Sequence, residues 1–335
     1  MGQLVGHGSH HRRRNLGYPA ASQRRHGHPQ NAPPKCGVSA IVKTVVEVFM
    51  HPFIIQADTL LKMQAAGEPV VVLDCSFDLM NPDNADDMFS TTHIADAAFA
   101  NLDRDLSTHD PESAINGGRH PLPHRGDFAQ TMGNWGIEPT TQVVVYDRNG
   151  QNFCGRAWWM MKWCGHEAVA ILDGGMAAWQ AAGGAMASGV ALKATSKSAY
   201  PLGAPLVTLT DLDAVWRHLD SDQTIVDARA AARYRGDVEP LDPIAGHIPG
   251  ALNLPFNENF DADGRFKSPD SLKQMWLKVL GDRNHAQVVM HCGSGVSAVP
   301  NVISMALAGL PTPALYAGSW SEWSRHPETP KTKEV

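Results

Sequence analysis

The sequence predicts an α/β protein of two tandem domains, each a parallel sheet flanked by helices. Short apolar runs rich in β-branched residues alternate with helical segments, and the same series occurs twice along the chain. Such alternation is typical of parallel strands joined by helices that cover the sheet. The 335 residues are enough for two domains of ordinary size, each with its own core.

The two series share motifs as well as order. The first has a strand ending at Asp74, a His-Ile-Ala-Asp-Ala motif from His93, and a strand over residues 143–146. The second has a strand ending at Asp227, a His-Ile-Pro-Gly-Ala motif from His247, and a strand over residues 287–290. The aspartate and the histidine are 19 residues apart in the first series and 20 in the second. This agreement indicates an internal duplication.

Composition suggests the domain boundaries. Residues 1–50 have repeated Arg, His and Pro and no acidic residue before Glu47, which predicts a disordered leader. An Arg-rich, acid-poor start is also typical of a mitochondrial transit peptide, although Gly and Pro interrupt the amphipathic helix that such a peptide needs. We expect a first domain over 51–185, a linker rich in Ala, Ser, Gly and Pro over 186–206, and a second domain over 207–330.

Charge and cysteine content narrow the classes of partner. A net charge of -6 argues against nucleic acid or an anionic membrane as the main partner. No apolar run approaches the roughly 18 residues of a membrane-spanning helix. The five cysteines form no Cys-x-x-Cys pair, so we expect a reducing compartment and neither a zinc site nor a disulfide framework. The protein is therefore expected in the cytoplasm, or in mitochondria if the leader is a transit peptide, without a metal or organic cofactor.

Cys292 is the candidate nucleophile. It lies between the strand over 287–290 and a predicted helix over 299–310. Gly293 and Gly295 allow the backbone to bend so that several N–H groups point at the sulfur, and the helix N-terminus adds partial positive charge. Such surroundings favour the reactive thiolate. A buried structural cysteine is the alternative.

The residues after Cys292 also exclude one class of enzyme. A phosphatase or arsenate reductase with this strand, loop and helix needs an Arg six residues after the Cys, where this chain has Ala298. A thiolate surrounded by N–H donors in a neutral loop suits sulfur transfer, in which the Cys holds the sulfur as a persulfide. The predicted surroundings of that sulfur are the loop residues Gly293, Gly295, Val296 and Ser297.

The run from Cys292 to Ala298 resembles the active loop of the mercaptopyruvate sulfurtransferases of the rhodanese superfamily, whose usual form has Thr where this chain has Ser297. The resemblance covers roughly residues 53–330 and implies two rhodanese-like domains. Alignment of the two halves places Asp147 opposite Cys292, so the first domain is expected to be the inactive copy. The resemblance also assigns Arg233, in an Arg-Tyr-Arg-Gly run, to binding of the anionic sulfur donor.

The identity of the donor stays open between two anions. Mercaptopyruvate sulfurtransferases typically have a second Arg nine residues after the first, where this chain has Asp242. An acidic residue there resembles the thiosulfate enzymes, yet their active loop has basic residues where this chain has Gly293 and Ser294. We expect mercaptopyruvate, because a neutral loop offers a dianion little and Ser294 can form a hydrogen bond with a thiol or carbonyl. Thiosulfate is the alternative.

Ser294 is also a candidate proton relay. The resemblance extends such a relay to a histidine of the first domain, here His93, with an aspartate among Asp83, Asp86 and Asp87. Histidines in this motif are also commonly structural, and His247 is the structural counterpart in the second domain.

The expected reaction is ping-pong sulfur transfer. The Cys292 thiolate takes sulfur from the donor, Arg233 neutralises the donor, and the persulfide passes to cyanide, a thiol or thioredoxin. Two alternatives belong to other classes. One is a carrier or redox-sensing module that holds a persulfide without turnover, and the other is a non-catalytic interaction protein.

Overall fold

The computed structural model describes residues 50–190 and 198–333. Except for Met50, the predicted leader lies outside the described residues, as do Cys36 and residues 191–197 of the predicted linker. Within the described ranges, no helix combines the length and the hydrophobicity that crossing a membrane requires.

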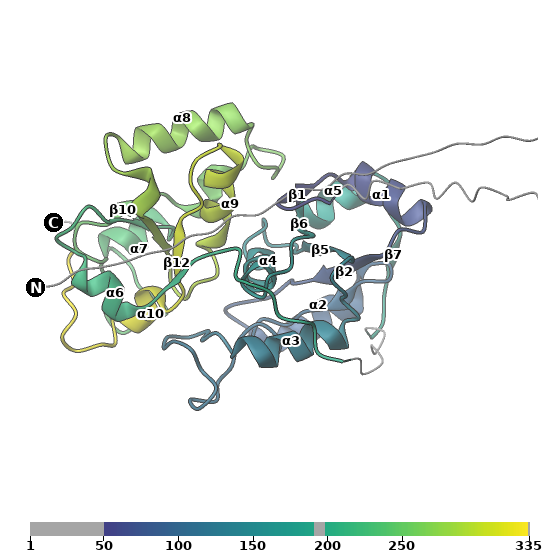
Figure 1. The fold of residues 1–335 in the computed structure, drawn as a ribbon, viewed down its shortest axis with the longest axis horizontal. Coiled ribbons are helices and arrows are strands. Elements are labelled where there is room, and N and C mark those ends of the chain that lie inside the picture. Colours follow the sequence, from purple (N-terminus) through teal and green to yellow (C-terminus); the bar gives the residue numbers. More distant parts are fainter. Residues whose placement is uncertain (1–49, 191–197, 334–335) are drawn as a thin grey trace, which may run out of the picture. The chain divides into compact units, whose positions relative to one another are not determined.

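The first domain is built on a five-stranded parallel sheet (Figure 1). Its strand order is β1-β6-β5-β2-β4. The strands are β1 (Ile54–Ile55), β2 (Val70–Asp74), β4 (Ala98–Phe99), β5 (Gln142–Tyr146) and β6 (Val169–Leu172). A separate antiparallel pair joins β3 (His93–Ile94) to β7 (Met186–Ala187).

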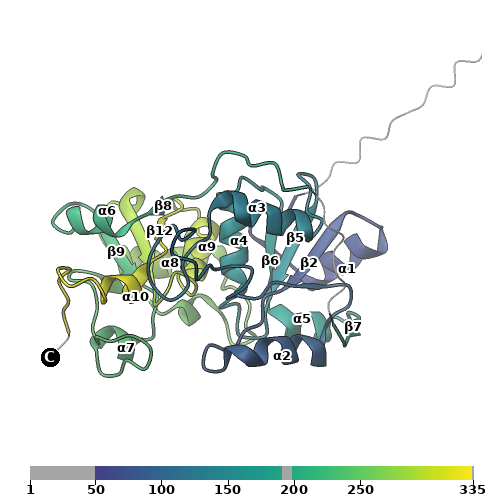
Figure 2. The ribbon, with the colours of Figure 1, turned by 90° about the horizontal axis from the view of Figure 1, so that it is seen from below.

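Helices cover both faces of this sheet (Figure 2). They are α1 (Ala57–Ala65), α2 (Ala85–Thr91) after the 3-10 turn η1 (Pro82–Asn84), α3 (Arg125–Asn134), α4 (Cys154–Trp163) and α5 (Gly175–Ala181). Val144 of β5 packs with α1 and α5, whereas Val143 and Val145 pack with α3 and α4. Alternate residues of β5 therefore face opposite helix layers, as the two-residue period of a strand requires.

The second domain repeats the plan. Its parallel sheet has the order β10-β9-β11-β12-β8. The strands are β8 (Leu209–Thr210), β9 (Thr224–Asp227), β10 (Leu252–Asn253), β11 (Val288–His291) and β12 (Ala314–Tyr316). The helices are α6 (Leu212–Arg217), α7 (Ala231–Arg235), α8 (Pro269–Leu280), α9 (Val299–Leu307) and α10 (Ser319–Trp323), with 3-10 turns η2 (Phe256–Asn259) and η3 (His285–Gln287). When the strands of each copy are taken in chain order, both sheets have the same arrangement, and the predicted fold class is confirmed.

The two copies share one hydrophobic core through α4 and α9. All ten residues of α4 are buried, because this helix packs on its own sheet and also against α9. Gly155 permits the close approach, since a Cβ atom at this position would lie 3.0 Å from the Cβ of Val299. Packing of this kind fixes the loops that lead into the two helices relative to each other.

The described part of the predicted linker forms backbone hydrogen bonds with the first domain. The N–H groups of Tyr200, Gly203 and Leu206 donate to carbonyl oxygens of residues 129, 164 and 162, which belong to α3, to the end of α4 and to α4 itself. Met186 and Ala187 of β7 also pair with the first domain, through β3.

Asp147 occupies the centre of the loop between β5 and α4. The carboxylate is buried and accepts hydrogen bonds of 2.7–2.9 Å from the N–H groups of Asn149, Gln151, Phe153 and Cys154. Burial raises the pKa of Asp147, while these four N–H donors favour its charged form. The backbone N–H groups of this loop therefore surround the carboxylate of Asp147.

Replacing Asp147 with Ala is expected to destabilise the protein by about 3 kcal/mol or more, because several buried N–H groups lose their acceptor. Chemical denaturation followed by tryptophan fluorescence measures the change. Asp282→Ala, at an exposed position after α8, is the matched control and is expected to change stability by less than about 0.5 kcal/mol. An Asp147→Ala variant as stable as this control would contradict the structural role.

Candidate active site

Cys292 directly follows β11 at the carboxyl edge of the second sheet, where ligands bind in open α/β folds. Its backbone is held by hydrogen bonds to α10, because its N–H donates to Ser319 Oγ (3.1 Å) and its carbonyl accepts from Trp320 N–H (3.0 Å). The loop requires glycine at Gly295, which has φ +73°, and a side chain there would collide with the Ala317 carbonyl oxygen. Helix α9 begins at Val299, as predicted, and ends three residues before the predicted end.

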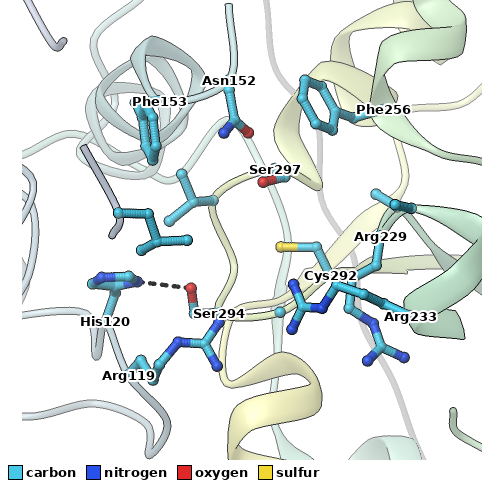
Figure 3. Close-up of a pocket in the computed structure, with 15 residues that line it drawn as sticks. Arg119, His120, Asn152, Phe153, Arg229, Arg233, Phe256, Cys292, Ser294 and Ser297 are labelled. Carbon is cyan, nitrogen blue, oxygen red and sulfur yellow. Dashed lines mark hydrogen bonds between the residues drawn. The ribbon is translucent and has the colours of Figure 1, made fainter. Parts of the chain in front are cut away.

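The Cys292 side chain opens into a cavity of about 210 Å³ (Figure 3). Both domains contribute to its walls. The first domain provides Leu79, Arg119, His120, Asn152 and Phe153, and the second provides Ala228, Arg229, Ala230, Arg233, Phe256, Gly293, Ser294, Val296 and Ser297. The cavity thus gathers Cys292, Ser294, Arg233, Gly293, Val296 and Ser297 from the sequence prediction, while Gly295 shapes the loop behind them.

The loop after Cys292 is the counterpart of the loop after Asp147. Helix α4 begins seven residues after Asp147 and α9 seven residues after Cys292, and Gly150 and Gly295 have matching φ values of +71° and +73°. The N–H groups of Ser294, Val296 and Ala298 correspond to three of the donors that bind the Asp147 carboxylate. In the described part of the chain these three groups donate to no other protein atom. They are therefore available to negative charge on the sulfur of Cys292.

Arg233 lines the cavity but is not a free cation. Its Nη2 donates to Glu239 Oε1 at 2.7 Å and lies 3.4 Å from Asp242 Oδ2. The neighbouring Arg229 is buried and bonded to Asp227, Glu239 and the Gly246 carbonyl, and it stacks on Trp320. These contacts fix the Arg229 side chain within the protein, so Arg233 is the better placed of the two for a ligand.

His120, a residue that the sequence prediction missed, contacts Ser294. The His120 Nδ1 lies 2.7 Å from Ser294 Oγ, and its Nε2 lies 3.6 Å from Asp103 Oδ1 (Figure 3 shows the first contact). Burial and, to a smaller extent, the charges of Arg156 and Arg119 lower the pKa of His120 to about 3. The imidazole is therefore neutral at neutral pH and can exchange a proton with the Ser294 hydroxyl.

The prediction of His93 for this role is corrected by the geometry. His93 does not line the cavity; its Nδ1 contacts the Phe89 carbonyl oxygen at 2.9 Å and its ring stacks on Phe89. Among the candidate aspartates, Asp86 pairs with Arg104 on the surface, and the carboxylate beside His120 belongs to Asp103. His120 was missed because it stands in a loop rich in Gly and Pro, outside the repeated motifs.

Arg156 of α4 joins His120 to the cysteine loop. The guanidinium is fully buried and donates to the carbonyl oxygens of His120 (2.9 Å), Gly295 (3.2 Å) and Leu106 (3.2 Å). Burial lowers the pKa of Arg156 to about 10, and negative charge on Cys292 opposes that shift. Arg156 therefore positions both sides of the cavity and remains positively charged.

Within residues 50–190 and 198–333, no three side chains of His, Cys, Asp or Glu are arranged to bind a metal ion.

Comparisons with known proteins agree with this arrangement. The model of the rhodanese-like domain matches the chain twice, at residues 56–182 and 211–326. The chain is 42% identical to a probable 3-mercaptopyruvate sulfurtransferase of Pseudomonas aeruginosa over 79% of this chain and 93% of the relative. It is 38% identical to a putative thiosulfate sulfurtransferase of Mycobacterium tuberculosis over 83% of this chain and 95% of the relative.

A solved structure shows the same fold. The 3-mercaptopyruvate sulfurtransferase of Leishmania major superposes with a TM-score of 0.71 at 29% identity, covering 82% of this chain and 75% of the other. Two rhodanese-like matches, close relatives named as sulfurtransferases and the shared fold lead to one conclusion. The chain belongs to the rhodanese family and is a sulfur-transferring enzyme.

Proposed function

We propose that the protein is a 3-mercaptopyruvate sulfurtransferase in which Cys292 receives the sulfur. The hydrogen bond between His120 and Ser294 is the observation that most supports this donor, because it places a proton relay in the Cys292 cavity. The thiol of mercaptopyruvate carries a proton that must move during the reaction, whereas the sulfur of thiosulfate carries none. A site that includes a neutral histidine and a serine fits the first donor better.

The first half-reaction then balances without an external oxidant or reductant. The Cys292 thiolate attacks the donor sulfur and forms an S–S bond, while the bond from sulfur to C3 of the donor breaks. The electron pair of the broken bond passes to C3. The thiol proton travels through Ser294 and His120 and is delivered to C3, so the leaving product is pyruvate. The enzyme keeps the sulfur as a Cys292 persulfide anion.

The N–H groups of Ser294, Val296 and Ala298 are placed to stabilise that anion, since their counterparts bind the Asp147 carboxylate. In the second half-reaction a nucleophile attacks the outer sulfur and the Cys292 thiolate leaves. Cyanide, a small thiol or thioredoxin can act as this acceptor. Turnover needs a reduced cysteine, and the four described cysteines are free thiols, so we also propose a reducing compartment such as the cytoplasm.

Thiosulfate is the second candidate donor. In that reaction the thiolate takes the outer sulfur, the S–S bond of the donor breaks, and sulfite leaves with the electron pair. Arg119 and Arg233 both line the cavity, and paired cations favour a dianion. No proton moves in this reaction, so it makes no use of the contact between His120 and Ser294.

We expect the wild-type protein to prefer mercaptopyruvate over thiosulfate by at least tenfold in kcat/KM, which corresponds to about 1.4 kcal/mol. Cyanide is the acceptor, and the assay measures thiocyanate. Cys292→Ser is expected to abolish turnover of both donors, while Cys164→Ser, at a buried cysteine outside the cavity, serves as the control. A preference for thiosulfate would overturn the assignment of mercaptopyruvate as the donor. A protein that takes up one equivalent of sulfur on Cys292 and does not turn over would be a persulfide carrier.

His120→Asn is expected to reduce kcat for mercaptopyruvate by about 100-fold or more, because the thiol proton loses its relay. Turnover of thiosulfate should change by less than about threefold, since that donor has no proton to transfer. Steady-state kinetics with both donors on the same preparation measures the difference. Equal losses for the two donors would show that His120 only supports the structure.

A further inference from the structure

Arg119 brings a second guanidinium to the cavity from the first domain. Its side chain is largely buried and lines the cavity. Its Nη2 lies 2.8 Å from the position that a Cβ atom would take at Gly293, and Arg233 Nη1 lies 3.4 Å from the same point. Two cations, one from each domain, therefore converge beside the residue that follows Cys292 (Figure 3).

Asp242 holds Arg119 in this place. The Asp242 carboxylate is fully buried and pairs with Arg119 Nη1, while Arg233 and Arg325 lie 3.4 and 3.8 Å away. The backbone N–H of Arg119 donates to Ser321 Oγ at 2.9 Å. Arg119 is thus bonded to the second domain through both its backbone and its guanidinium, and a fixed guanidinium loses little entropy when it binds a ligand.

Arg119 retains unused hydrogen-bond donors. Within the described residues its Nε is buried without a partner, and its Nη2 makes no hydrogen bond to the protein. A buried N–H group without an acceptor is costly, and a ligand oxygen can satisfy it. The net charge of the surrounding ion-pair cluster also favours an anionic ligand, because four arginines face three carboxylates and leave one positive charge in excess. The cluster consists of Arg119, Arg229, Arg233 and Arg325 with Asp227, Glu239 and Asp242.

We propose that Arg119 binds the carboxylate of the α-keto acid donor together with Arg233, and that Asp242 positions Arg119 for this contact. The inference rests on the proposed function and extends it, because it assigns the carboxylate of the donor to a residue of the domain that lacks the nucleophile. The acidic residue at position 242, which resembles the thiosulfate enzymes, is then compatible with mercaptopyruvate as the donor. It is the partner of a cation that reaches the site from the other domain.

The test compares two donors that differ only in the carboxylate. Mercaptopyruvate has a thiol, a ketone and a carboxylate, whereas mercaptoacetone (1-mercaptopropan-2-one) has the thiol and ketone alone. We expect Arg119→Met to lower kcat/KM for mercaptopyruvate about 30- to 100-fold, mainly through KM, and to change that for mercaptoacetone by less than about threefold. Arg119→Lys should restore part of the loss, because it keeps the charge but not the planar donor pair.

Controls separate binding from folding. Arg217→Met removes an exposed arginine of α6 and should leave both donors unaffected. If Arg119→Met does not fold because Asp242 is left with too little positive charge, Arg119→Met with Asp242→Asn removes the pair together, and the same loss of selectivity is expected.

The outcomes distinguish this inference from the proposed function. A wild-type protein that prefers thiosulfate over mercaptopyruvate would overturn the proposed donor, whereas one that uses mercaptopyruvate no better than mercaptoacetone would overturn carboxylate recognition and this inference with it. A wild-type protein that prefers mercaptopyruvate, with an Arg119→Met variant that keeps this preference, would overturn the role of Arg119 alone. Equal losses for both donors in Arg119→Met, with mercaptopyruvate still preferred, would likewise overturn it, because they would mark Arg119 as a structural residue.

Discussion

The geometry of the site depends on a buried guanidinium that binds carbonyl oxygens. Arg156 donates to the carbonyls of His120 and Gly295, one on each side of the cavity. Burial of a charge is unfavourable unless hydrogen bonds and opposite charge compensate it. Among the described residues its hydrogen-bond partners are backbone carbonyls and no carboxylate, so its positive charge remains available to anionic sulfur at Cys292. One side chain therefore joins the two domains and contributes to the electrostatics of the site.

The two copies of the active loop show how one backbone serves two purposes. In the first copy the Asp147 carboxylate occupies the ring of N–H groups, which makes that loop a self-contained structural unit. In the second copy Cys292 stands at the same position, and the corresponding N–H groups of Ser294, Val296 and Ala298 donate to no acceptor among the described residues. Substitution at a single position thus separates a loop that stabilises the fold from one that can stabilise charge on a reacting sulfur.

The fold and the cysteine loop could be predicted because their signals are local and repeated. The strand that ends at His291, the two glycines and the helix from Val299 are adjacent in sequence, and the duplication gave an independent check on each element. The same reliance on repeated motifs led to the wrong prediction for His93, which belongs to such a motif but lies outside the cavity. His120 and Arg119 lie between β4 and α3, in a segment that forms no helix and belongs to neither set of repeated motifs. Their approach to Ser294 and Asp242 spans more than 120 residues, and no local pattern predicts such a contact.

The two domains contribute different residues to the cavity around Cys292. In this chain the cysteine loop carries no cationic side chain, and a Cβ atom at Gly293 would already meet Arg119. The first domain adds Arg119 and His120 to the cavity, the residues that we propose act with Arg233 in donor binding and with Ser294 in proton transfer. The first copy has Asp147 where the second has the nucleophile, and it contributes to the site through the residues that line the shared cavity. The domain without the cysteine is then a working part of the active site, and the contacts of Arg156 and Asp242 between the domains keep that surface in register with Cys292.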